Sequence, residues 1–363
     1  MRNVFGNNLQ IAVFGESHGP YIGITIDGLS AGIEVNKEVI NNLLSLRRPA
    51  TSYETQRVEL DKFEIISGVF NGFTNGNPLT IIIPNSNTKS ADYDDLKIKP
   101  RPGHADYVAN VKYDGYQDYR GGGHFSGRIT AAIVAGGAIL LNQLEKIGVE
   151  IASHILSIGE VKDKKFNKDG SDLSFMKEAK FPAFTNIEAM EEVMKNAAKD
   201  GDSVGGVIET MVKGLPVGLG SPMFDSFESM LSHAMFSIGA IKGIEFGEGF
   251  NFANLKGSEA NDEFAFENDK IVTKTNHNGG VNGGITNGMP VTFNVAVKPT
   301  PSISKTQNTV DLKNNENAEL VVKGRHDPAI IRRVNIVVRC MTAFVVADFL
   351  IQRYGEEVLK KGF

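Results

Sequence analysis

Apolar residues recur along the chain with the two periods that distinguish strands from helices. The alternation over Tyr21–Asp27 predicts a strand with one buried face. Asn36 precedes apolar side chains at helical spacing and can cap a helix that runs to Leu46. Residues 129–147 are mostly apolar and predict a long helix that stops at Gly148. The same criteria predict strands over 79–83, before Pro84, and over 204–212 and 291–297, and helices over 187–198, 224–236 and within 327–353, the last opening near Pro328.

These elements favour an α+β protein. Short strands cluster in each half of the chain with few strand–helix–strand alternations, so we expect antiparallel or mixed sheets. Residues 250–285 and 303–319 are rich in Asn, Gly and Lys, which is typical of loops or insertions. A length of 363 residues fits one large domain or two modest ones.

An internal repeat divides the chain. Residues 15–33 align with 201–219 without a gap, sharing five glycine-or-serine and two aliphatic identities: Gly15/Gly201, Ser17/Ser203, Gly19/Gly205, Ile22/Ile208, Gly28/Gly214, Leu29/Leu215 and Gly32/Gly218. Further on, TNGNPLT at 74–80 is echoed by TNGMPVT at 286–292. We predict two quasi-equivalent halves, about 1–155 and 200–363, packed into a single domain around a pseudo-twofold; chance coincidence of glycines is the alternative.

Composition narrows the class of protein. Hydrophobic residues make up 41% and charged residues 22%, which excludes a mainly disordered chain. The formal net charge of −5 argues against a general nucleic-acid or membrane-surface binder. A single cysteine, Cys340, excludes an internal disulfide framework and fits a reducing compartment. No apolar run approaches the ~20 residues of a bilayer span, and the first residues lack a signal-peptide pattern, so a cytoplasmic protein is expected.

Arginines gather in the segments that contain glycine or proline. No arginine occurs between Arg128 and Arg325, and the grouped ones are Arg47, Arg48, Arg101, Arg120, Arg128 and Arg325. The guanidinium group offers a planar fork of donors that binds carboxylate and phosphate in a bidentate manner. Clustering with histidines in glycine-rich loops favours a polyanionic ligand, and scattered surface charge is the alternative.

Two histidines are candidates for acid–base chemistry. His18 in GESHG and His104 in RPGHAD each occupy a turn near a carboxylate, Glu16 or Asp106. An unperturbed imidazole pKa of about 6.5 allows proton transfer at neutral pH. His18 becomes Val204 in the second copy of the repeat, which suggests chemistry in one copy only. His154 and His233, within a predicted strand and helix, are expected to be structural.

Three loops are candidates for anion binding. In YRGGGHFSGRIT, at 119–130, three glycines, Ser126 and two arginines precede a long helix, whose N-terminus favours phosphate. It matches neither a dinucleotide fingerprint nor a P-loop. KPTPSIS, at 298–304, is either a phosphate-binding loop or a plain turn. In GRHDP, at 324–328, Asp327 is either a functional carboxylate or a helix N-cap. Metal binding by His104, Asp106 and His124 is the alternative, but no close HxH or HExxH spacing is present, so no metal site is expected.

Together these motifs resemble the chorismate synthase family. They occur in the family's order along nearly the whole chain: GESHG, LRRPAT, SGVFNG, RPGHADY, DYRGGGHFSGR, GDSVGG, GIEFGEGF, NHNGGVNGG, KPTPSI and KGRHDP. The resemblance implies a lyase of aromatic amino acid biosynthesis, which converts 5-enolpyruvylshikimate 3-phosphate to chorismate by anti-1,4-elimination of phosphate. It also implies a need for reduced FMN without net redox change. The implied fold is a β-α-β sandwich with helices between two antiparallel sheets, and the implied assembly is a homotetramer.

The resemblance also implies roles for individual residues. His18 would be the acid near the departing phosphate, His104 would protonate or hold reduced flavin, and Asp327 would help to deprotonate flavin or substrate. The anions of substrate, flavin or both would be bound by Arg48, Arg101, Arg128 and Arg325, with Ser17 in the substrate site and Arg47 near a pyridine nucleotide. Flavin would contact His124, Phe125, Ser126, Gly239, Ala240, Gly283, Lys298, Pro299, Thr300, Pro301 and Ser302.

The chain departs from the family pattern at several positions. His124 stands where arginine is usual and Phe125 where a small polar residue is usual. Ala50 replaces a glycine, and Ile336 and Arg339 replace a proline and a glutamate.

From the residues alone, two other functions stay open. A phosphotransferase or nucleotide-binding enzyme would use the same loops, but no Walker serine or threonine and no paired acidic motif accompanies the glycines. A non-enzymatic anion-binding or assembly protein would not require two loop histidines. The two halves account for nearly all of the chain and leave no nicotinamide domain. We therefore expect FMN to be reduced by an external flavin reductase, with NADPH as a direct reductant only if Arg47 receives its phosphate.

Overall fold

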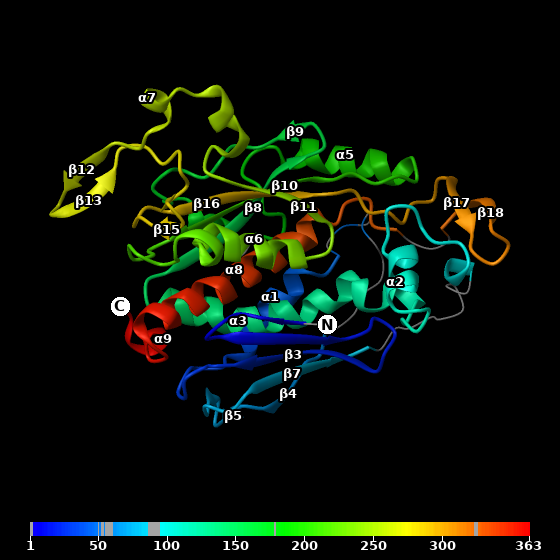
Figure 1. Ribbon diagram of the computed structural model, residues 1–363, viewed down its shortest axis with the longest axis horizontal. Coiled ribbons are helices and arrows are strands. Elements are labelled where there is room, and N and C mark those ends of the chain that lie inside the picture. Colours follow the sequence, from blue (N-terminus) through cyan, green and yellow to red (C-terminus); the bar gives the residue numbers. More distant parts are fainter. Residues whose placement is uncertain are drawn as a thin grey trace.

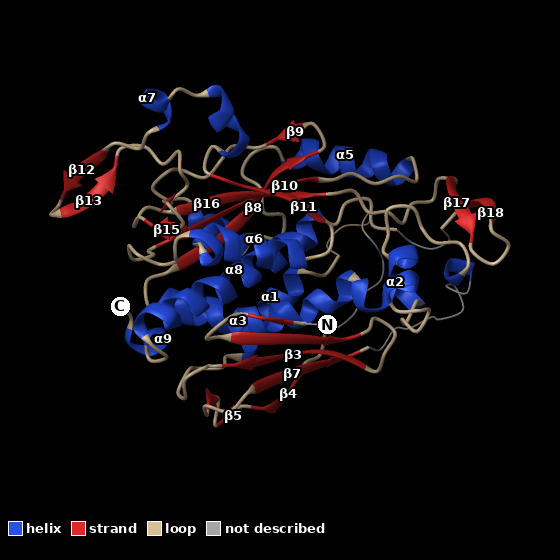
Figure 2. Ribbon diagram, viewed as in Figure 1, coloured by secondary structure: helices blue, strands red, loops and turns tan. Residues whose placement is uncertain are grey.

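The computed structural model describes residues 3–49, 51, 54, 61–85, 95–177, 179–322 and 326–363. Two five-stranded sheets form outer layers, and long helices lie between them (Figures 1 and 2). Every strand pairing among the described residues is antiparallel. The expectation of an α+β protein with antiparallel sheets is confirmed.

The first sheet is built from the N-terminal part of the chain. Its strand order is β1 (Val4–Phe5), β2 (Gln10–Gly15), β3 (Tyr21–Asp27), β7 (Leu79–Pro84) and β4 (Glu64–Ser67). The predicted strand β3 has the predicted bounds, and its Ile22, Ile24 and Ile26 are fully buried. The strand β7 extends one residue beyond prediction, to include Pro84. The buried isoleucines of both strands face the helices because alternate side chains point to the same side.

The second sheet has the strand order β11 (Ile241–Phe246), β16 (Val291–Val297), β10 (Gly206–Lys213), β8 (Glu150–Ile158) and β9 (Val161–Lys162). The three longest strands, β8, β10 and β16, are adjacent and mostly buried. The expected strand at 204–212 is thus present two residues later, as β10. His154 lies within β8, as expected for a structural histidine.

The helices between the sheets are α1 (Lys37–Leu46), α3 (Thr130–Lys146), α6 (Phe227–Ser237) and α8 (Ile331–Tyr354) (Figure 1). The side chain of Asn36 caps α1 by accepting from the backbone of Glu38 and Val39, as predicted. The helix α5 (Ile187–Lys199) covers the outer side of the second sheet. Shorter helices are α2 (Asp106–Lys112), α4 (Leu173–Met176), α7 (Gly257–Ala260) and α9 (Val358–Lys361).

Two helices reach the length and apolar composition of membrane spans, contrary to the expectation that no segment would do so. They are Gly127–Lys146 and Ile331–Tyr354, and 83% and 100% of their apolar windows are buried inside the protein. Both are the central helices of the core, where they pack against each other and against the sheets. Burial on all sides explains their apolar composition.

The remaining differences from the predicted elements have local causes. The helix α6 begins at Phe227, three residues late, because Ser226 caps it by accepting from the backbone of Ser229. The helix α8 begins at Ile331 rather than near Pro328, and α9 follows it. The segments predicted as loops contain hairpins, formed by β12 (Phe264–Glu267) with β13 (Lys270–Thr273), β14 (Val281–Asn282) with β15 (Ile285–Thr286), and β17 (Gln307–Asp311) with β18 (Glu316–Leu320). One more hairpin joins β5 (Val69–Phe70) to β6 (Phe73–Thr74).

The two threonines of the TNG repeat make matching hydrogen bonds. Thr74 Oγ1 accepts from the backbone of Ile33 at 2.9 Å and donates to Ser30 O at 2.7 Å. Thr286 Oγ1 accepts from the backbone of Leu219 at 2.9 Å and donates to Pro216 O at 2.7 Å. In each case the threonine ties a hairpin to the loop after a long central strand of its sheet.

Candidate active site

A glycine-rich segment lies at the centre of the site. Residues Arg120–Phe125 form a 3-10 segment before α3, in which Gly121, Gly122 and Gly123 have positive φ angles of 61°, 92° and 53°. A Cβ atom at position 121 would lie 2.2 Å from His18 Cε1, and one at position 122 would lie 3.4 Å from the His104 ring. The approach at position 121 permits only glycine, and the positive φ angles favour glycine at all three positions. The segment therefore brings the two candidate histidines to consecutive residues.

His18 is buried in a turn after β2. Ser17 Oγ lies 3.2 Å from His18 Nδ1 and also donates to Arg120 O at 3.2 Å. The backbone N–H of Ser17 donates to Gly123 O at 3.1 Å. The Ser17–His18 dipeptide is thus attached to the glycine segment through both main chain and side chain.

His104 is held by an ion-paired carboxylate. Its Nδ1 lies 2.6 Å from Asp106 Oδ1, and Arg101 donates to both Asp106 oxygens at 2.7 and 2.8 Å. Burial would raise the pKa of the Asp106 carboxyl, but hydrogen bonds and positive charge from Arg101 and His104 outweigh it and hold the pKa well below its usual range. A permanent carboxylate at Nδ1 orients the imidazole and leaves Nε2 on the side of Gly122.

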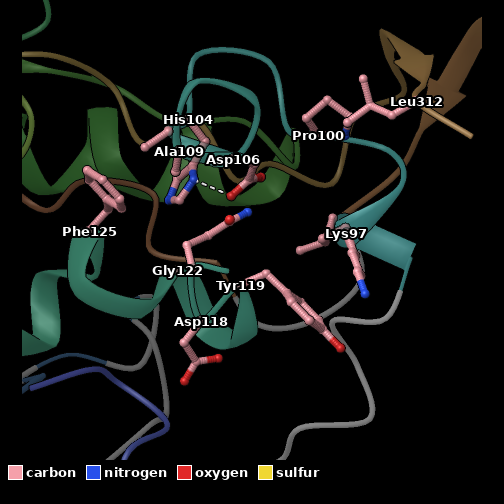
Figure 3. Close-up of a pocket in the computed structure, with 13 residues that line it drawn as sticks. Lys97, Pro100, His104, Asp106, Ala109, Asp118, Tyr119, Gly122, Phe125 and Leu312 are labelled. Atoms are coloured by element: carbon pink, nitrogen blue, oxygen red, sulfur yellow. Dashed lines mark ion pairs between the residues drawn. The ribbon is translucent and has the colours of Figure 1, made fainter. Parts of the chain in front are cut away.

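A pocket of about 370 Å³, including its open mouth, lies beside His104. In Figure 3 the His104–Asp106 pair lies on one side of it and Tyr119 and Lys97 lie across from that pair. Lys97 Nζ is 5.6 Å from the centre of the Tyr119 ring. The lining combines aromatic and aliphatic surface with a few charged groups, as small-molecule sites do; it also includes Leu96, Pro100, Ala109, Gln117, Asp118, Gly122, Phe125 and Leu312.

The segment after β16 meets the His104 turn. Lys298 Nζ donates to Gly103 O at 2.5 Å, and Arg101 Nη1 donates to Ser302 Oγ at 3.1 Å. The backbone of Lys298 also donates to Ala240 O at 2.9 Å, which brings the 239–240 turn to the same place. Ala240 has a positive φ of 75°. Residues from the C-terminal part of the chain thus complete a site begun by the N-terminal part.

Two of the candidate arginines share one buried carboxylate. Arg128 Nη1 donates to Asp61 Oδ1, and Arg47 Nη1 lies 3.6 Å from Asp61 Oδ2. All three side chains are at least nine-tenths buried. Arg47 Nη2 also donates to Gly127 O at 3.0 Å, next to the glycine segment. The pairing with Asp61 stabilises two cations that would otherwise be costly to bury together.

Asp327 is linked to the backbone of Arg47 through Arg333. It is buried and pairs with Arg333, with 2.5 Å between Oδ2 and Nη1, while Arg333 Nε donates to Arg47 O at 3.0 Å. Burial raises the pKa of Asp327, and the Arg333 charge offsets only part of that effect. The alternative of a helix N-cap is not realised, because Ile330 precedes α8 and no side chain caps it. Asp327 Oδ1 has no hydrogen-bond partner among the described residues.

Other expected site residues have more varied surroundings. His124 contacts Gly15 O through Nδ1 at 3.0 Å and Asn3 Nδ2 through Nε2 at 3.2 Å, so both ring nitrogens are engaged by the N-terminal strands. Phe125 is 44% exposed and lines the pocket. Ser126 Oγ accepts from the backbone of Arg128 at 3.2 Å. Each therefore borders the site in a different way.

Among the expected residues that the structure describes, Gly283 does not join this cluster. Gly283 lies in the turn between β14 and β15. The nearby Gly279 and Gly280 pack against the first residues of β16, whereas Lys298 follows the last residue of that strand. Arg325 and Ala50 lie outside the described residues. Arg48 follows Arg47, and its carbonyl oxygen accepts from Arg332 Nη2, which is itself paired with Glu54.

Motif analysis missed three residues that connect the site. Asp61 joins Arg47 to Arg128, Arg333 joins Asp327 to Arg47, and Asn85 accepts from Arg128 Nε at 3.0 Å. Asn85 follows a predicted strand and Arg333 lies near the start of a predicted helix, which are weak signals. Asp61 carried none. Side chains from distant segments thus form one network from Asp327 to the His18 turn.

Comparison with known proteins identifies the family of this chain. The family model described as chorismate synthase matches residues 9–351. The chorismate synthase of Korarchaeum cryptofilum (strain OPF8) is 45% identical over 352 residues, covering 96% of this chain and 98% of that protein. That of Thermococcus gammatolerans is also 45% identical, covering 97% and 98%. A solved structure, described as a crystal structure of chorismate synthase, has a TM-score of 0.77 at 30% identity, covering 98% of this chain and 96% of that one. This chain belongs to the chorismate synthase family.

Proposed function

We propose that this protein eliminates phosphate from 5-enolpyruvylshikimate 3-phosphate to form chorismate, as its family does. The observation that carries the proposal is that one glycine segment borders both histidines, with the Arg101–Asp106–His104 group on the side of Gly122. A second network joins the turn of His18 to Arg128, Arg47 and Asp327. A substrate with two carboxylates and a phosphate requires several bidentate cations, which arginine supplies and lysine does not. A carbon–oxygen lyase acting on a phosphate therefore fits both family and geometry.

The residues present are compatible with FMN. Thr300 Oγ1 is buried and has no hydrogen-bond partner among the described residues. A Cβ atom at Gly239 would meet no atom within 4 Å, so the backbone there leaves room for a ligand. Together with the Lys298 ammonium, these features suit a polar, anionic group. We infer that FMN would be held by Lys298, Pro299, Thr300, Pro301, Ser302, Gly239 and Ala240, and that its reduced form would supply transient electron donation without net redox change.

The chain's own residues would bind the substrate and move protons. Arg128 and Arg101 would bind substrate anions, with Arg48 and Ser17 beside them. His18 would donate a proton toward the departing phosphate; its ring is next to the Ser17 hydroxyl and to Gly121 of the glycine segment. His104, oriented by Asp106, would hold a proton at Nε2. Burial raises the pKa of Asp327, which makes its carboxylate a better proton acceptor than an ordinary aspartate.

We further propose that the chain is a single internally duplicated domain, residues 1–363. Three adjacent strands have the same order in both sheets: β3, β7 and β4 in the first correspond to β10, β16 and β11 in the second. The matching hydrogen bonds of Thr74 and Thr286 support the same inference. The helices α1 and α3 then correspond to α6 and α8 in order along the chain.

We propose a cytoplasmic homotetramer that receives reduced FMN from an external reductase. The reducing cytoplasm is consistent with one cysteine, which is free and buried. Exposed apolar side chains on the projecting β12–β13 hairpin, Phe264, Phe266 and Ile271, offer a surface for subunit contact. Direct reduction by NADPH at Arg47 is the less favoured route, because Arg47 is already engaged by Asp61, Gly127 and Thr130.

The test is anaerobic incubation of the protein with 5-enolpyruvylshikimate 3-phosphate and photoreduced FMN, with chorismate and phosphate as readouts. Equal formation of both supports the function, and absence of both refutes it. His18→Ala and His104→Ala should each lower turnover by ~10²–10⁴ without unfolding the protein. Replacing the reductant by NADPH, with oxidised FMN and no reductase, should give no sustained chorismate.

A further inference from the structure

Asn85 lies where the end of β7 meets the His18 turn, and its amide group joins two parts of the site. Its Nδ2 donates to Glu16 O at 2.9 Å and to Gly19 O at 2.8 Å. Its Oδ1 accepts from Arg128 Nε at 3.0 Å. Carbonyl oxygens only accept and an arginine N–H only donates, so the partners fix which way the amide points. Both ends of the side chain are therefore used.

On one side, Asn85 closes the turn that carries His18. The two carbonyl groups that it binds belong to residues 16 and 19, which flank the Ser17–His18 dipeptide. The backbone N–H of Gly19 donates to Glu16 O at 3.0 Å, and the backbone N–H of Asn85 donates to Pro20 O at 3.1 Å. Asn85 thus holds the turn through its main chain and its side chain.

On the other side, Asn85 helps to fix the plane of the Arg128 guanidinium group. Arg128 Nε donates to Asn85, Nη1 donates to Asp61, and Nη2 donates to Pro84 O at 3.2 Å. Two of these three acceptors are consecutive residues at the end of β7. A strand anchored in the first sheet therefore determines where the arginine fork points.

We propose that Asn85 is a positioning residue that sets the His18 imidazole relative to the Arg128 fork. This inference rests on the proposed function, in which Arg128 binds a substrate anion and His18 serves the departing phosphate. Asn85 need not touch the substrate to affect the reaction. A displacement of about 1 Å between a binding group and a reacting group lowers a rate by ~10², and one amide spans both groups here.

Kinetic comparison of Asn85→Asp and Asn85→Ala separates the two contacts. The aspartate keeps an acceptor for Arg128 but loses both donors to the turn and places a carboxylate against two carbonyl oxygens. We expect Asn85→Asp to lower kcat by about 10–100-fold with KM near that of the wild type. Asn85→Ala should lower kcat and raise KM as well. Asn77→Ala, an exposed asparagine just before the same strand, is the control and should change neither.

A double-mutant cycle distinguishes positioning from general destabilisation. If Asn85 acts through His18, adding Asn85→Asp to His18→Ala should change kcat by less than about twofold. If the double variant instead shows the product of the two single-variant losses in kcat, the proposal is overturned. A wild-type kcat in both Asn85 variants would also overturn it. Thermal unfolding of each variant shows whether it is folded, and Asn85→Ser replaces any variant that is not.

Chemical modification gives a readout that does not require turnover. Diethylpyrocarbonate acylates accessible neutral histidines, and peptide mass spectrometry resolves His18 from His104 in one sample. Loss of two hydrogen bonds to the turn should raise the modification rate of His18 about tenfold in Asn85→Asp, with His104 unchanged. An unchanged rate at His18, or an equal rise at both histidines, would refute the positioning role. A wild type that forms no chorismate would instead refute the proposed function.

Discussion

The imidazole of His18 occupies the space that a side chain on Gly121 would require. A Cβ atom at position 121 would lie 2.2 Å from His18 Cε1, 2.3 Å from Nδ1 and 2.7 Å from Ser17 Oγ. The positive φ of Gly121 adds strain for any other residue. His18, the proposed acid, can therefore take its position only because Gly121 of the facing loop has no side chain.

Gly121→Ala should consequently displace His18 and lower turnover. We expect kcat to fall by ~10² or more, because an added methyl group cannot coexist with the present ring position. The control is Gly257→Ala, at the start of α7, where a Cβ atom would meet nothing within 4 Å. Chorismate formation by both variants is the measurement, and equal activity would contradict the placement of His18.

Asp106→Asn should remove a pH-dependent part of the stability. The folded-state pKa of Asp106 is below the unfolded value of about 3.9, so its contribution is complete above that pH and is lost as pH falls toward the folded pKa. Urea unfolding at pH 7 should show the variant less stable than the wild type, and the gap should narrow at pH 3. If the difference in unfolding free energy between variant and wild type stays constant from pH 7 to pH 3, the ionised carboxylate of Asp106 is not its cause.

Arg128→Lys should not be a conservative change. Lysine cannot reproduce the separate contacts of Arg128 to Asn85, Asp61 and Pro84. Each charge-assisted contact with the substrate that lysine fails to make should weaken substrate binding by ~1.5–3 kcal/mol. That corresponds to about 10–100-fold in affinity per contact. Arg353→Lys, near the end of α8 and exposed, is the control. Unchanged affinity of the flavin-loaded Arg128 variant would contradict an anion-binding role.

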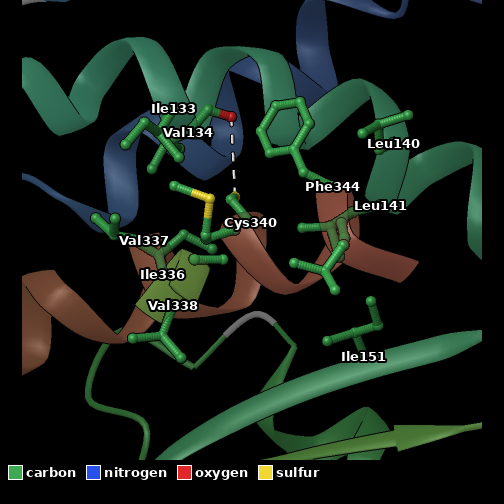
Figure 4. Packing of buried hydrophobic residues seen from close by; sticks show 14 of the residues in the cluster. Ile133, Val134, Leu140, Leu141, Ile151, Ile336, Val337, Val338, Cys340 and Phe344 are labelled. Atoms are coloured by element: carbon green, nitrogen blue, oxygen red, sulfur yellow. Dashed lines mark hydrogen bonds between the residues drawn. The ribbon is translucent and has the colours of Figure 1, made fainter. Parts of the chain in front are cut away.

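Close packing of α3 on α8 makes Gly137 a sensitive position. A Cβ atom at position 137 would lie 2.4 Å from Cys340 Cβ and 2.9 Å from its Cα. One at Gly136 would meet only the ends of side chains, the nearest being Ile26 Cδ1 at 2.9 Å and Phe344 Cζ at 3.1 Å. Figure 4 shows Cys340 in this crossing, with its thiol directed to Val134 O. Gly137→Ala should destabilise the fold by ~1–3 kcal/mol, and Gly136→Ala should cost less. Urea unfolding of the pair measures the difference.

The thiol of Cys340 should be chemically inert in the folded protein. Complete burial raises its pKa to about 12, and only the thiolate reacts with alkylating agents. Iodoacetamide at pH 8 should label the native protein only as fast as it unfolds, and should label it rapidly in urea. Rapid labelling of native protein would show that the α3–α8 crossing opens locally.

Local signals along the chain predicted the central elements well. The strand β3 and the strand β16 have their predicted bounds, and Asn36 and Gly148 bound α1 and α3 as expected. These elements bury one face or all faces, so their apolar period is strong. The β12–β13 and β17–β18 hairpins were predicted as loops. Most of their residues are exposed or partly exposed, so their sequences carry little apolar pattern. Without a buried face, a strand has no apolar alternation to detect.

The motifs by themselves indicated which loops carry the candidate chemistry, because glycine, histidine and arginine occur together in them. The glycine segment, the two histidine turns and the Lys298 loop are all identifiable in this way. Only the tertiary structure decided how they are joined. Asp61 and Asn85 reach Arg128 across 67 and 43 residues of sequence, and Arg333 links Asp327 to the backbone of Arg47. No local rule relates such residues, since their proximity arises from two sheets packing on shared helices.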